Sequence, residues 1–439
     1  MIRMKTSTGM TTFTIIWFGQ LISLLGTGMS RFALLIWAYQ QTGQATTLAM
    51  LGFFAWLPFV LIGPLAGVWV DRYNRRWIMM IADLGAGLAT IVLARLYFSG
   101  DLQVWHLYGL EVSASVFEAF QLPAFAAATS TLLPKQQYAR ANGMRVLARD
   151  TSQVFAPLAG GALLAVTSLG TILLVDVATF IFGVSVLLFV RIPAPKPLEM
   201  AEIGQTFWRQ FTLGIAYLRQ RPGLMGLAFL FFGIHLFATL TYFSVLPALI
   251  LARSNGDEVA LGMVQAALGG AGIVGGIIVS VVGLPKRKIH AILLGCALSF
   301  LLGDFLFAIG QTLPSWLTAA CVSAIFIPFI STANQTIWQE KVAPALQGRI
   351  FAARNAIQNA SFPLGYLLAG PLADRVFEPA MRNNGALASV FGWLVGTGPG
   401  AGIGMMFVCT AILGGLMSLS GYLVAAVRNV EVDLADYEE

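Results

Sequence analysis

The sequence predicts an all-α polytopic membrane protein in which twelve transmembrane helices form two pseudo-symmetric six-helix bundles. Its 439 residues are 57% hydrophobic and only 10% charged, whereas a soluble globular protein carries about 25% charged residues. The apolar residues gather in long stretches that are separated by short basic loops. The two halves of the chain also show a weak internal repeat.

Each apolar stretch is long enough for a membrane helix, which needs roughly 20 residues. The predicted spans are 14–39, 46–70, 77–98, 104–131, 143–167, 170–190, 223–250, 259–283, 289–309, 315–340, 349–375 and 402–427.

Lysine and arginine fall almost entirely in one set of alternate loops. That set and the termini hold 21 of the 26 basic residues, and the opposite loops hold only Arg253, Arg375 and Arg382. Basic loops stay in the cytoplasm, so we expect a protein of the inner (plasma) membrane with both termini cytoplasmic. Topology thus explains the net charge of +6, and no nucleic-acid partner is expected.

The longest interior loop divides the chain into halves. Residues 191–222 begin with a proline-rich stretch and continue with an amphipathic one around Trp208, which predicts a linker followed by an interfacial helix. The expected domains are an N-terminal bundle at 1–190, this linker at 191–222, a C-terminal bundle at 223–427 and an acidic cytoplasmic tail at 428–439.

The halves repeat at two offsets. An offset of 205 residues pairs Arg149 with Arg354, and an offset of 213 pairs Gly63 with Gly276. Such repeats are typical of transporters built from two related bundles.

No residue pattern indicates a cofactor, a metal or an enzyme. The three cysteines lie in apolar stretches without C-x-x-C spacing, so we expect inert packing residues. The glycine-rich segment 396–400 lacks the G-K-[ST] ending of a phosphate-binding loop. Without a nucleotide-binding domain, transport would use an ion gradient.

A short motif follows the second predicted span. Gly63 and Gly67 share a helix face on which another helix can approach closely, and Asp71 lies on that face one turn later. Three arginines complete the loop, at Arg72, Arg75 and Arg76. The motif resembles the loop signature between the second and third helices of the major facilitator superfamily. A generic tight helix pair that ends in a basic loop is the alternative.

The resemblance implies a role for this loop as a conformational latch. By that resemblance, Asp71 meets the positive N-terminal end of the eleventh span near Gly348, with Arg75 in the same network. The corresponding loop of the second half keeps only its basic residues, 286–288.

Other stretches resemble one branch of that superfamily, the bacterial exporters that include macrolide efflux proteins and enterobactin exporters. One stretch holds Pro157, Gly160 and Gly161 in the fifth span and is similar to the G-P-x-x-G-G signature of proton-driven antiporters, with Ala156 in place of the first glycine. The resemblance implies that these small residues pack helices at the domain interface.

Ionisable residues inside membrane spans are costly and therefore informative. The first span carries Gln20 and Arg31 on one polar stripe, and the fourth carries Glu111 and Glu118 on one face. The resemblance implies that these two spans line a central cavity. Arg31 and Glu111 lie at similar depth, so we expect an ion pair. Glu118 lies near the midplane without a partner that the sequence identifies. Burial would favour its protonated form, so it is either a proton carrier or a hydrogen-bonded structural acid.

The second half offers His235 in the seventh span and Asn334 in the tenth as further cavity candidates, and packing is the alternative for the histidine. Arg149 with Asp150 and Arg354 stand one turn inside the cytoplasmic edge, where they form an inner gate or extend toward the interface. The acids of the third, sixth and ninth spans, Asp83, Asp176 and Asp304, are assigned structural roles.

The favoured function is export of amphipathic or hydrophobic small molecules by proton antiport with alternating access. The expected partners are the substrate, protons and the lipid bilayer, and we expect a monomer. An importer or facilitator, or a membrane scaffold or sensor that does not transport, are the alternatives.

Overall fold

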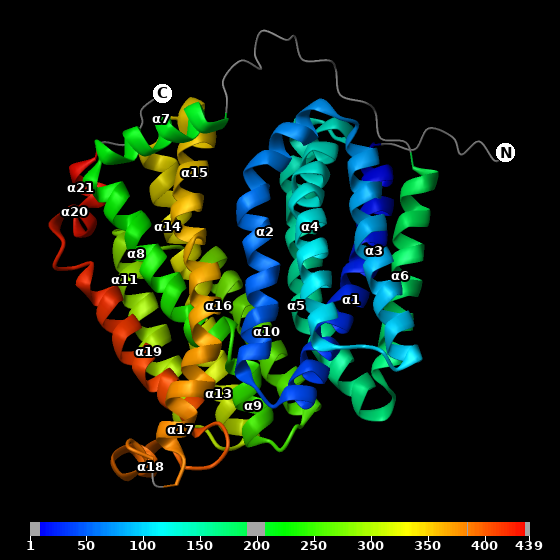
Figure 1. The fold of residues 1–439 in the computed structure, drawn as a ribbon. Helices are drawn as coiled ribbons and strands as arrows, with labels where there is room; N and C mark the ends of the chain where they lie inside the picture. Colours follow the sequence, from blue (N-terminus) through cyan, green and yellow to red (C-terminus); the bar gives the residue numbers. More distant parts are fainter. Residues whose placement is uncertain (1–8, 191–206, 384, 435–439) are drawn as a thin grey trace. The chain divides into compact units, whose positions relative to one another are not determined.

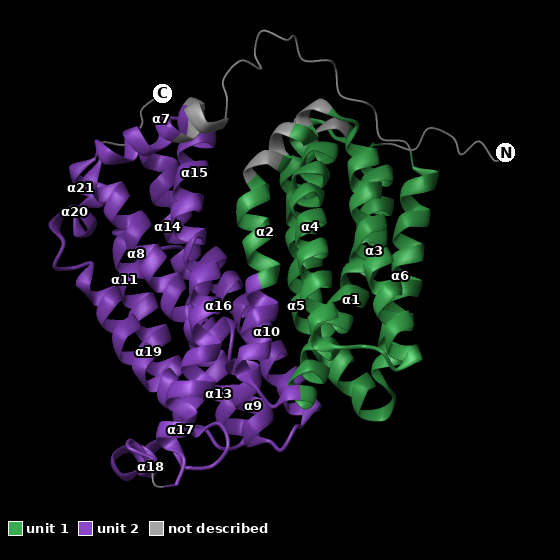
Figure 2. Cartoon of the chain, viewed as in Figure 1, with its two compact units in different colours: residues 1–41, 54–204 green, residues 42–53, 205–439 purple. Residues whose placement is uncertain are grey.

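The computed structural model describes residues 9–190, 207–383 and 385–434, and all regular secondary structure in these ranges is helical (Figure 1). The chain divides into two compact units (Figure 2). The first comprises residues 1–41 and 54–204, and the second comprises residues 42–53 and 205–439.

The first unit is built from the six predicted N-terminal spans. Its elements are α1 (Gly9–Thr42), α2 (Ala45–Arg72), α3 (Arg75–Ser99), α4 (Val104–Leu132), the short 3₁₀ helix η1 (Lys135–Gln137), α5 (Tyr138–Val166) and α6 (Leu169–Phe189). The first residues of α2 belong to the second unit.

The second unit contains more and shorter helices, because several predicted spans are interrupted. From α7 to α12 the elements are α7 (Phe207–Arg219), α8 (Pro222–Ala238), η3 (Thr239–Phe243), α9 (Leu246–Arg253), α10 (Glu258–Val282), α11 (Lys288–Leu298), η4 (Ser299–Asp304) and α12 (Phe305–Ile309). They continue as α13 (Leu313–Ala324), α14 (Ile327–Lys341), α15 (Pro344–Asn359), α16 (Ser361–Pro371), η5 (Leu372–Phe377), α17 (Glu378–Met381), α18 (Ala388–Val395), α19 (Ala401–Ser420), α20 (Ala425–Arg428) and α21 (Val430–Asp433).

Prolines account for three of these interruptions. Pro247 and Pro328 stand at the first turn of α9 and α14, where a residue without an N–H is tolerated although it disrupts a helix interior. Pro371 ends α16 and is followed directly by the π-helix η5. The predicted spans 223–250, 315–340 and 349–375 are therefore broken helices.

Within the described ranges, nine helical segments are long and apolar enough to cross a membrane. The other long helical stretches are α4, α5 and α15 with α16, and they carry the candidate residues Glu111, Glu118, Arg149, Asp150 and Arg354. These ionisable side chains lower the hydropathy of the helices that carry them.

The predicted last span, 402–427, is wrong at its end because α19 stops at Ser420. A turn follows at 421–423, and Glu431 of α21 accepts hydrogen bonds from the backbone N–H groups of Lys288 and Ile289 (3.1 and 2.9 Å). These are free donors at the start of α11, which a carboxylate stabilises. The predicted tail 428–439 thus begins as short helices on the second unit, and residues 435–439 lie outside the described ranges.

The predicted helix after the linker is present as α7, which packs against α15. A Cβ atom added at Gly214 would stand 2.8 Å from both Arg349 O and the Ala353 Cβ. The glycine is therefore required for this close approach of two helices.

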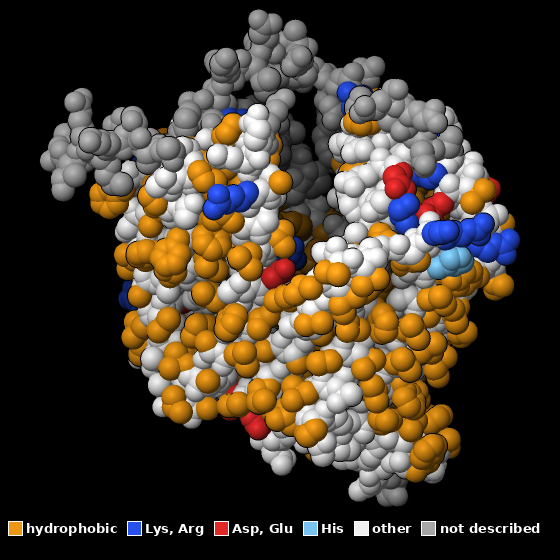
Figure 3. Space-filling view, turned by 180° about the vertical axis from the view of Figure 1, so that it is seen from behind, with side chains coloured by type: hydrophobic (Ala, Val, Ile, Leu, Met, Phe, Trp, Pro, Cys, Tyr) orange, Lys and Arg blue, Asp and Glu red, His pale blue; other side chains and the backbone are white. Residues whose placement is uncertain are grey.

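The outer surface of the second unit is apolar over most of its visible length, and charged side chains gather near one end (Figure 3). Large exposed side chains follow one another along η4 and α12, among them Leu301, Leu302 and Phe305. Tightly packed interior residues such as Trp338 and Phe307 are fully buried. An exposed surface this apolar suits contact with lipid.

Candidate functional site

The polar stripe of α1 faces the interior of the first unit, and each of its groups finds a different partner. Gln20 contacts Asp83 of α3, Thr27 contacts Asp176 of α6, and Arg31 contacts the glutamates of α4. One helix therefore links three others through polar contacts.

Arg31 holds both carboxyl groups of α4. Its Nη1 lies 2.8 Å from Glu118 Oε1, and its Nη2 lies 3.8 Å from Glu111 Oε2. Glu111 and Glu118 are seven residues apart, which is two helical turns, so they share one face. Glutamate side chains are long and flexible, so both carboxyl groups can bend toward the two terminal nitrogens of one guanidinium.

The structure contains the expected Arg31–Glu111 pair, and it also pairs Arg31 with Glu118, for which the sequence identified no partner. Glu118 is the nearer carboxyl, and its side chain is 41% exposed, against 13% for Glu111. The Arg31–Glu118 contact was not predicted, because the sequence placed the two residues at different depths in the membrane. A long arginine side chain can reach along the helix and bridge that difference. We name Arg31, Glu111 and Glu118 the charged trio.

A second network continues from the charged trio along α4. Gln121, one turn after Glu118, donates from Nε2 to Gln20 Oε1 (2.9 Å) and to one oxygen of Asp83. Gln20 Nε2 donates to the other oxygen, Asp83 Oδ2 (2.9 Å). Asp83 is buried, and two amides satisfy a buried carboxyl without an opposite charge. From the sequence, Asp83 was assigned to an outer span with a structural role. The glutamines on α1 and α4 were the sequence feature that could have indicated its partners.

The described part of the predicted latch connects helices of the first unit. Arg76 Nε and Nη2 donate to the carbonyl oxygens of Leu187 and Leu188 (3.0 and 2.7 Å) at the end of α6. Asn74 caps α3 by accepting from Arg76 N (3.0 Å). A cation at a helix C-terminus is favourable because the last carbonyls carry partial negative charge.

The rest of the latch is only partly described. In the described part of the first unit, a Cβ atom added at Gly63 would meet no atom within 4 Å, and the close helix approach expected at this motif stays a prediction. Arg75 Nε is buried and has no hydrogen-bond partner among the described residues. The surroundings of Gly67 and the side chains of Asp71 and Arg72 are not among the described parts of the chain, and the predicted Asp71 contact stays a prediction.

His235 and Asn334 take packing roles in the second unit. The imidazole of His235 lies between the rings of Phe231 and Phe362, at centroid distances of 5.8 and 5.0 Å. Asn334 is buried, and its Oδ1 accepts from Trp338 Nε1 (3.0 Å) on the next turn of α14. The two ring contacts favour the packing alternative that the sequence left open for the histidine.

The predicted inner-gate residues have different environments. Arg354 is buried; its Nη1 donates to Gln335 Oε1 (3.1 Å), and its guanidinium lies 5.3 Å from the Trp338 ring. Arg149, its repeat partner on α5, is exposed, and Asp150 beside it is half-buried. The repeat thus preserves the residue type and not its surroundings.

The small residues of α5 pack against α1. Pro157, Gly160 and Gly161 are buried, and a Cβ atom at Gly160 would stand 3.1 Å from Phe32 and 3.4 Å from Met29 O. The stretch therefore brings two helices of one bundle together.

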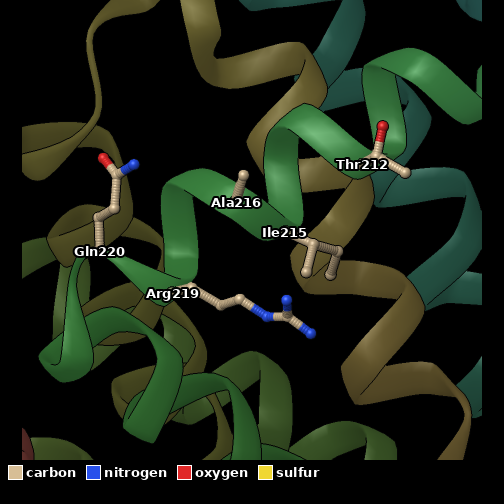
Figure 4. Close-up of a pocket in the computed structure, with 5 residues that line it drawn as sticks. All are labelled: Thr212, Ile215, Ala216, Arg219 and Gln220. Atoms are coloured by element: carbon tan, nitrogen blue, oxygen red, sulfur yellow. The ribbon is translucent and has the colours of Figure 1, made fainter.

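A cavity of about 500 Å³ lies along α7 and is lined by Thr212, Ile215, Ala216, Arg219 and Gln220 (Figure 4). None of these residues belongs to the charged trio or to the Gln20–Asp83–Gln121 network, so this cavity plays no part in the site described above.

A family model described as the Major Facilitator Superfamily matches residues 16–366. The chain belongs to the major facilitator superfamily. It is therefore a multi-pass membrane transporter and not an enzyme, and its helices form the twelve-span major facilitator fold.

Curated proteins similar to this major facilitator include efflux proteins. Macrolide efflux protein A of Streptococcus pyogenes is 28% identical over 369 residues, covering 83% of this chain and 90% of that protein. Multidrug efflux pump Tap of Mycobacterium tuberculosis is 27% identical over 376 residues, covering 82% of this chain and 86% of that protein.

Solved structures of other transporters share the fold of this superfamily member. The nucleoside transporter NupG superposes with a TM-score of 0.72 at 12% identity, covering 93% of this chain and 99% of that chain. A bacterial homologue of the human lysosomal transporter Spinster superposes with a TM-score of 0.68 at 16% identity, covering 96% of this chain and 98% of that chain.

Proposed function

We propose that the protein exports amphipathic or hydrophobic small molecules across the plasma membrane in exchange for protons. The family supports transport, and the names of the macrolide and multidrug efflux relatives support export of drug-like compounds. The basic-loop bias supports cytoplasmic termini. Both bundles are on one chain, so the proposal requires only a monomer.

The charged trio is the observation on which the proposal rests. One guanidinium balances two carboxyl groups on the facing helix, so a single added proton changes the net charge of the trio. Membrane-embedded ionisable groups of this kind form proton relays in transporters. A carboxylate–arginine pair is also poised to separate when the carboxylate is neutralised, because the attraction between unit charges is then lost.

In the proposed cycle, a proton from outside binds the carboxylate of Glu118 and ends its ion pair with Arg31. Arg31 keeps its contact with Glu111, which holds one compensating charge near α1. The proton leaves Glu118 toward the cytoplasm, and the pair with Arg31 re-forms while the substrate site is loaded. Proton and substrate thus occupy the protein alternately, as antiport requires.

Asp83 is the other carboxyl within this part of the first unit. Gln121 links it to the helix face of Glu118, and two amide donors hold it. We assign Asp83 a positioning role, because its partners fix the relative rotation of α1, α3 and α4. It becomes the next candidate carrier if Glu118 fails the test below.

The test uses the purified protein in proteoliposomes with an acidic interior and a radiolabelled macrolide as the probe. For a protein that is inserted inside out, the proton gradient should drive accumulation of the probe. Glu118→Gln, which mimics the protonated carboxyl, should abolish this uphill uptake and leave downhill counterflow measurable.

Two control variants sharpen the result. Glu111→Gln makes the same chemical change on the same helix and should retain gradient-driven uptake, although at a lower rate. Asp83→Asn tests the neighbouring carboxyl. Uphill uptake by Glu118→Gln at the wild-type rate would exclude Glu118 as the carrier, and loss in Asp83→Asn alone would transfer the role to Asp83.

A further inference from the structure

Two buried aspartates outside the charged trio have the same kind of surroundings in the two units. In the first unit, Asp176 of α6 accepts from Thr27 Oγ1 of α1 (3.1 Å) and from Thr90 Oγ1 of α3 (3.3 Å). In the second unit, Asp304 of η4 accepts from Thr410 Oγ1 of α19 (2.9 Å) and from Thr241 Oγ1 of η3 (3.4 Å). Each junction therefore holds one carboxyl and two threonine hydroxyls, and Ser30 of α1 is a further hydroxyl donor to Asp176 in the first.

The helices that meet at the two junctions correspond in order. α1, α3 and α6 are the first, third and sixth membrane helices of the first half. η3, η4 and α19 lie in the first, third and sixth spans of the second half. The same three positions of the repeat thus come together in each unit.

The residues correspond as well, but the acid has changed helix. Thr241 follows Thr27 by 214 residues, and Asp304 follows Thr90 by the same 214 residues. The third pair, Asp176 and Thr410, is 234 residues apart. The longer spacing has a simple origin, since α17 and α18 extend the loop before the last span of the second half.

Burial makes each of these groups costly unless it is paired. Asp176 and Asp304 are 2% and 3% exposed, and Thr241 and Thr410 are buried with them. A buried carboxyl without hydrogen-bond donors would be strongly unfavourable, whereas two hydroxyl donors satisfy it. The two threonines of the second junction also lie 3.1 Å apart, oxygen to oxygen, so all three groups form one hydrogen-bonded set.

We propose that each bundle contains the same hydrogen-bonded junction, and that it requires one carboxyl and two hydroxyls but accepts the carboxyl from different helices. The junction holds the first, third and sixth helices of a bundle together, so that the bundle moves as one body during transport. In the first bundle it also positions the charged trio, because Thr27 lies one turn before Arg31 on α1. The proposal does not depend on which group carries the proton.

Transposing the acid tests the proposal. Asp304→Thr combined with Thr410→Asp places the acid of the second junction on the sixth span, as in the first bundle. Reciprocally, Asp176→Thr combined with Thr90→Asp places the acid of the first junction on the third span, as in the second bundle. The assay heats the detergent-solubilised protein and follows its monodisperse peak in size-exclusion chromatography. Each single change should lower the temperature at which half of this peak is lost. Each transposed pair should recover most of that loss.

A composition-matched control separates transposition from a general effect of charge. Asp304→Thr combined with Thr167→Asp contains the same residues but places the new acid at the exposed end of α5, and it should show no recovery. The milder variant Asp304→Asn keeps an acceptor oxygen and measures the junction if the single changes fail to fold. Transposed pairs that are no more stable than the worse single variant would overturn the proposal. A wild-type midpoint for Asp304→Asn and Asp304→Thr alike would overturn it as well.

Discussion

Arg31 is expected to stabilise the first bundle because two carboxyl groups depend on it. Arg31→Met keeps an unbranched side chain, although a shorter one, and removes its charge, so Glu111 and Glu118 are left facing each other without compensation. The matched control is Arg95→Met on α3, where the arginine is exposed and the chemical change is the same.

The exposure of each partner sets the expected magnitude. An exposed ion pair contributes about 0.2–1 kcal/mol, whereas removing one member of a fully buried pair costs about 3–5 kcal/mol. Arg31 and Glu118 are 35% and 41% exposed, and Glu111 is 13% exposed. The trio lies between the two limits, so Arg31→Met should lower the free energy of unfolding by about 2 kcal/mol. Arg95→Met should change it by less than about 0.5 kcal/mol.

A double-mutant cycle then isolates the interaction. Adding Glu111→Gln to Arg31→Met removes one of the two stranded charges and should restore about 1 kcal/mol. The assay is denaturant unfolding in detergent micelles followed by tryptophan fluorescence, with Glu118→Gln in a parallel cycle. If the single changes simply add within about 0.5 kcal/mol in both cycles, the charged trio does not exist as an energetic unit. If Arg95→Met lowers the free energy of unfolding by the same amount, the effect would be common to any arginine in a span and not specific to the charged trio.

Three further predictions concern the ends of helices. Glu431→Gln should lower the free energy of unfolding by about 1 kcal/mol, the usual effect of losing a helix cap, because Glu431 accepts from two N–H groups of α11. Asp433→Asn, at an exposed position, is the control for charge. Equal unfolding midpoints of the two variants would contradict the assignment. Asp374 accepts from the N–H groups of Ala45 and Thr46 at 3.0 and 2.7 Å, so Asp374→Asn should increase hydrogen exchange at the start of α2, and unchanged exchange there would refute the capping role. Arg253 donates to four carbonyl groups at the ends of α12 and α18 and in the turn after α12. Arg253→Lys should therefore lower the unfolding midpoint, and changing the concentration of a phosphate-free salt should not restore it. Recovery of the midpoint at low salt would instead indicate a long-range charge effect.

The positions of most membrane helices could be predicted from the sequence, because the bilayer imposes one rule on every span. Backbone groups in lipid must bond within the helix, so about 20 apolar residues predict a helix wherever they occur. The interruptions were less predictable. Pro247, Pro328 and Pro371 mark three of them, but the π-helix η4 has no proline in its sequence, and its form depends on the packing of neighbouring helices.

The charged trio shows which features of the site could be predicted from the sequence. Spacing placed Glu111 and Glu118 on one face of α4 and identified Arg31 as an available cation. It did not determine which carboxyl lies nearer, since a flexible side chain can reach either one. Asp83 was similarly visible as an acid within a span, but its bonds to Gln20 and Gln121 join residues that are 63 and 38 positions apart.

The sequence by itself determined the membrane class, the approximate spans, the repeat and the residues whose charge must be compensated inside the bilayer. These follow from local composition and spacing, because hydrophobic thickness and desolvation act on each segment separately. The tertiary structure alone decided which groups provide the compensation: Arg31 for Glu118, glutamine amides for Asp83, and threonine hydroxyls for Asp176 and Asp304. Hydrogen bonds and ion pairs act only over about 3–4 Å, so their partners are fixed by how the helices rotate and pack against one another.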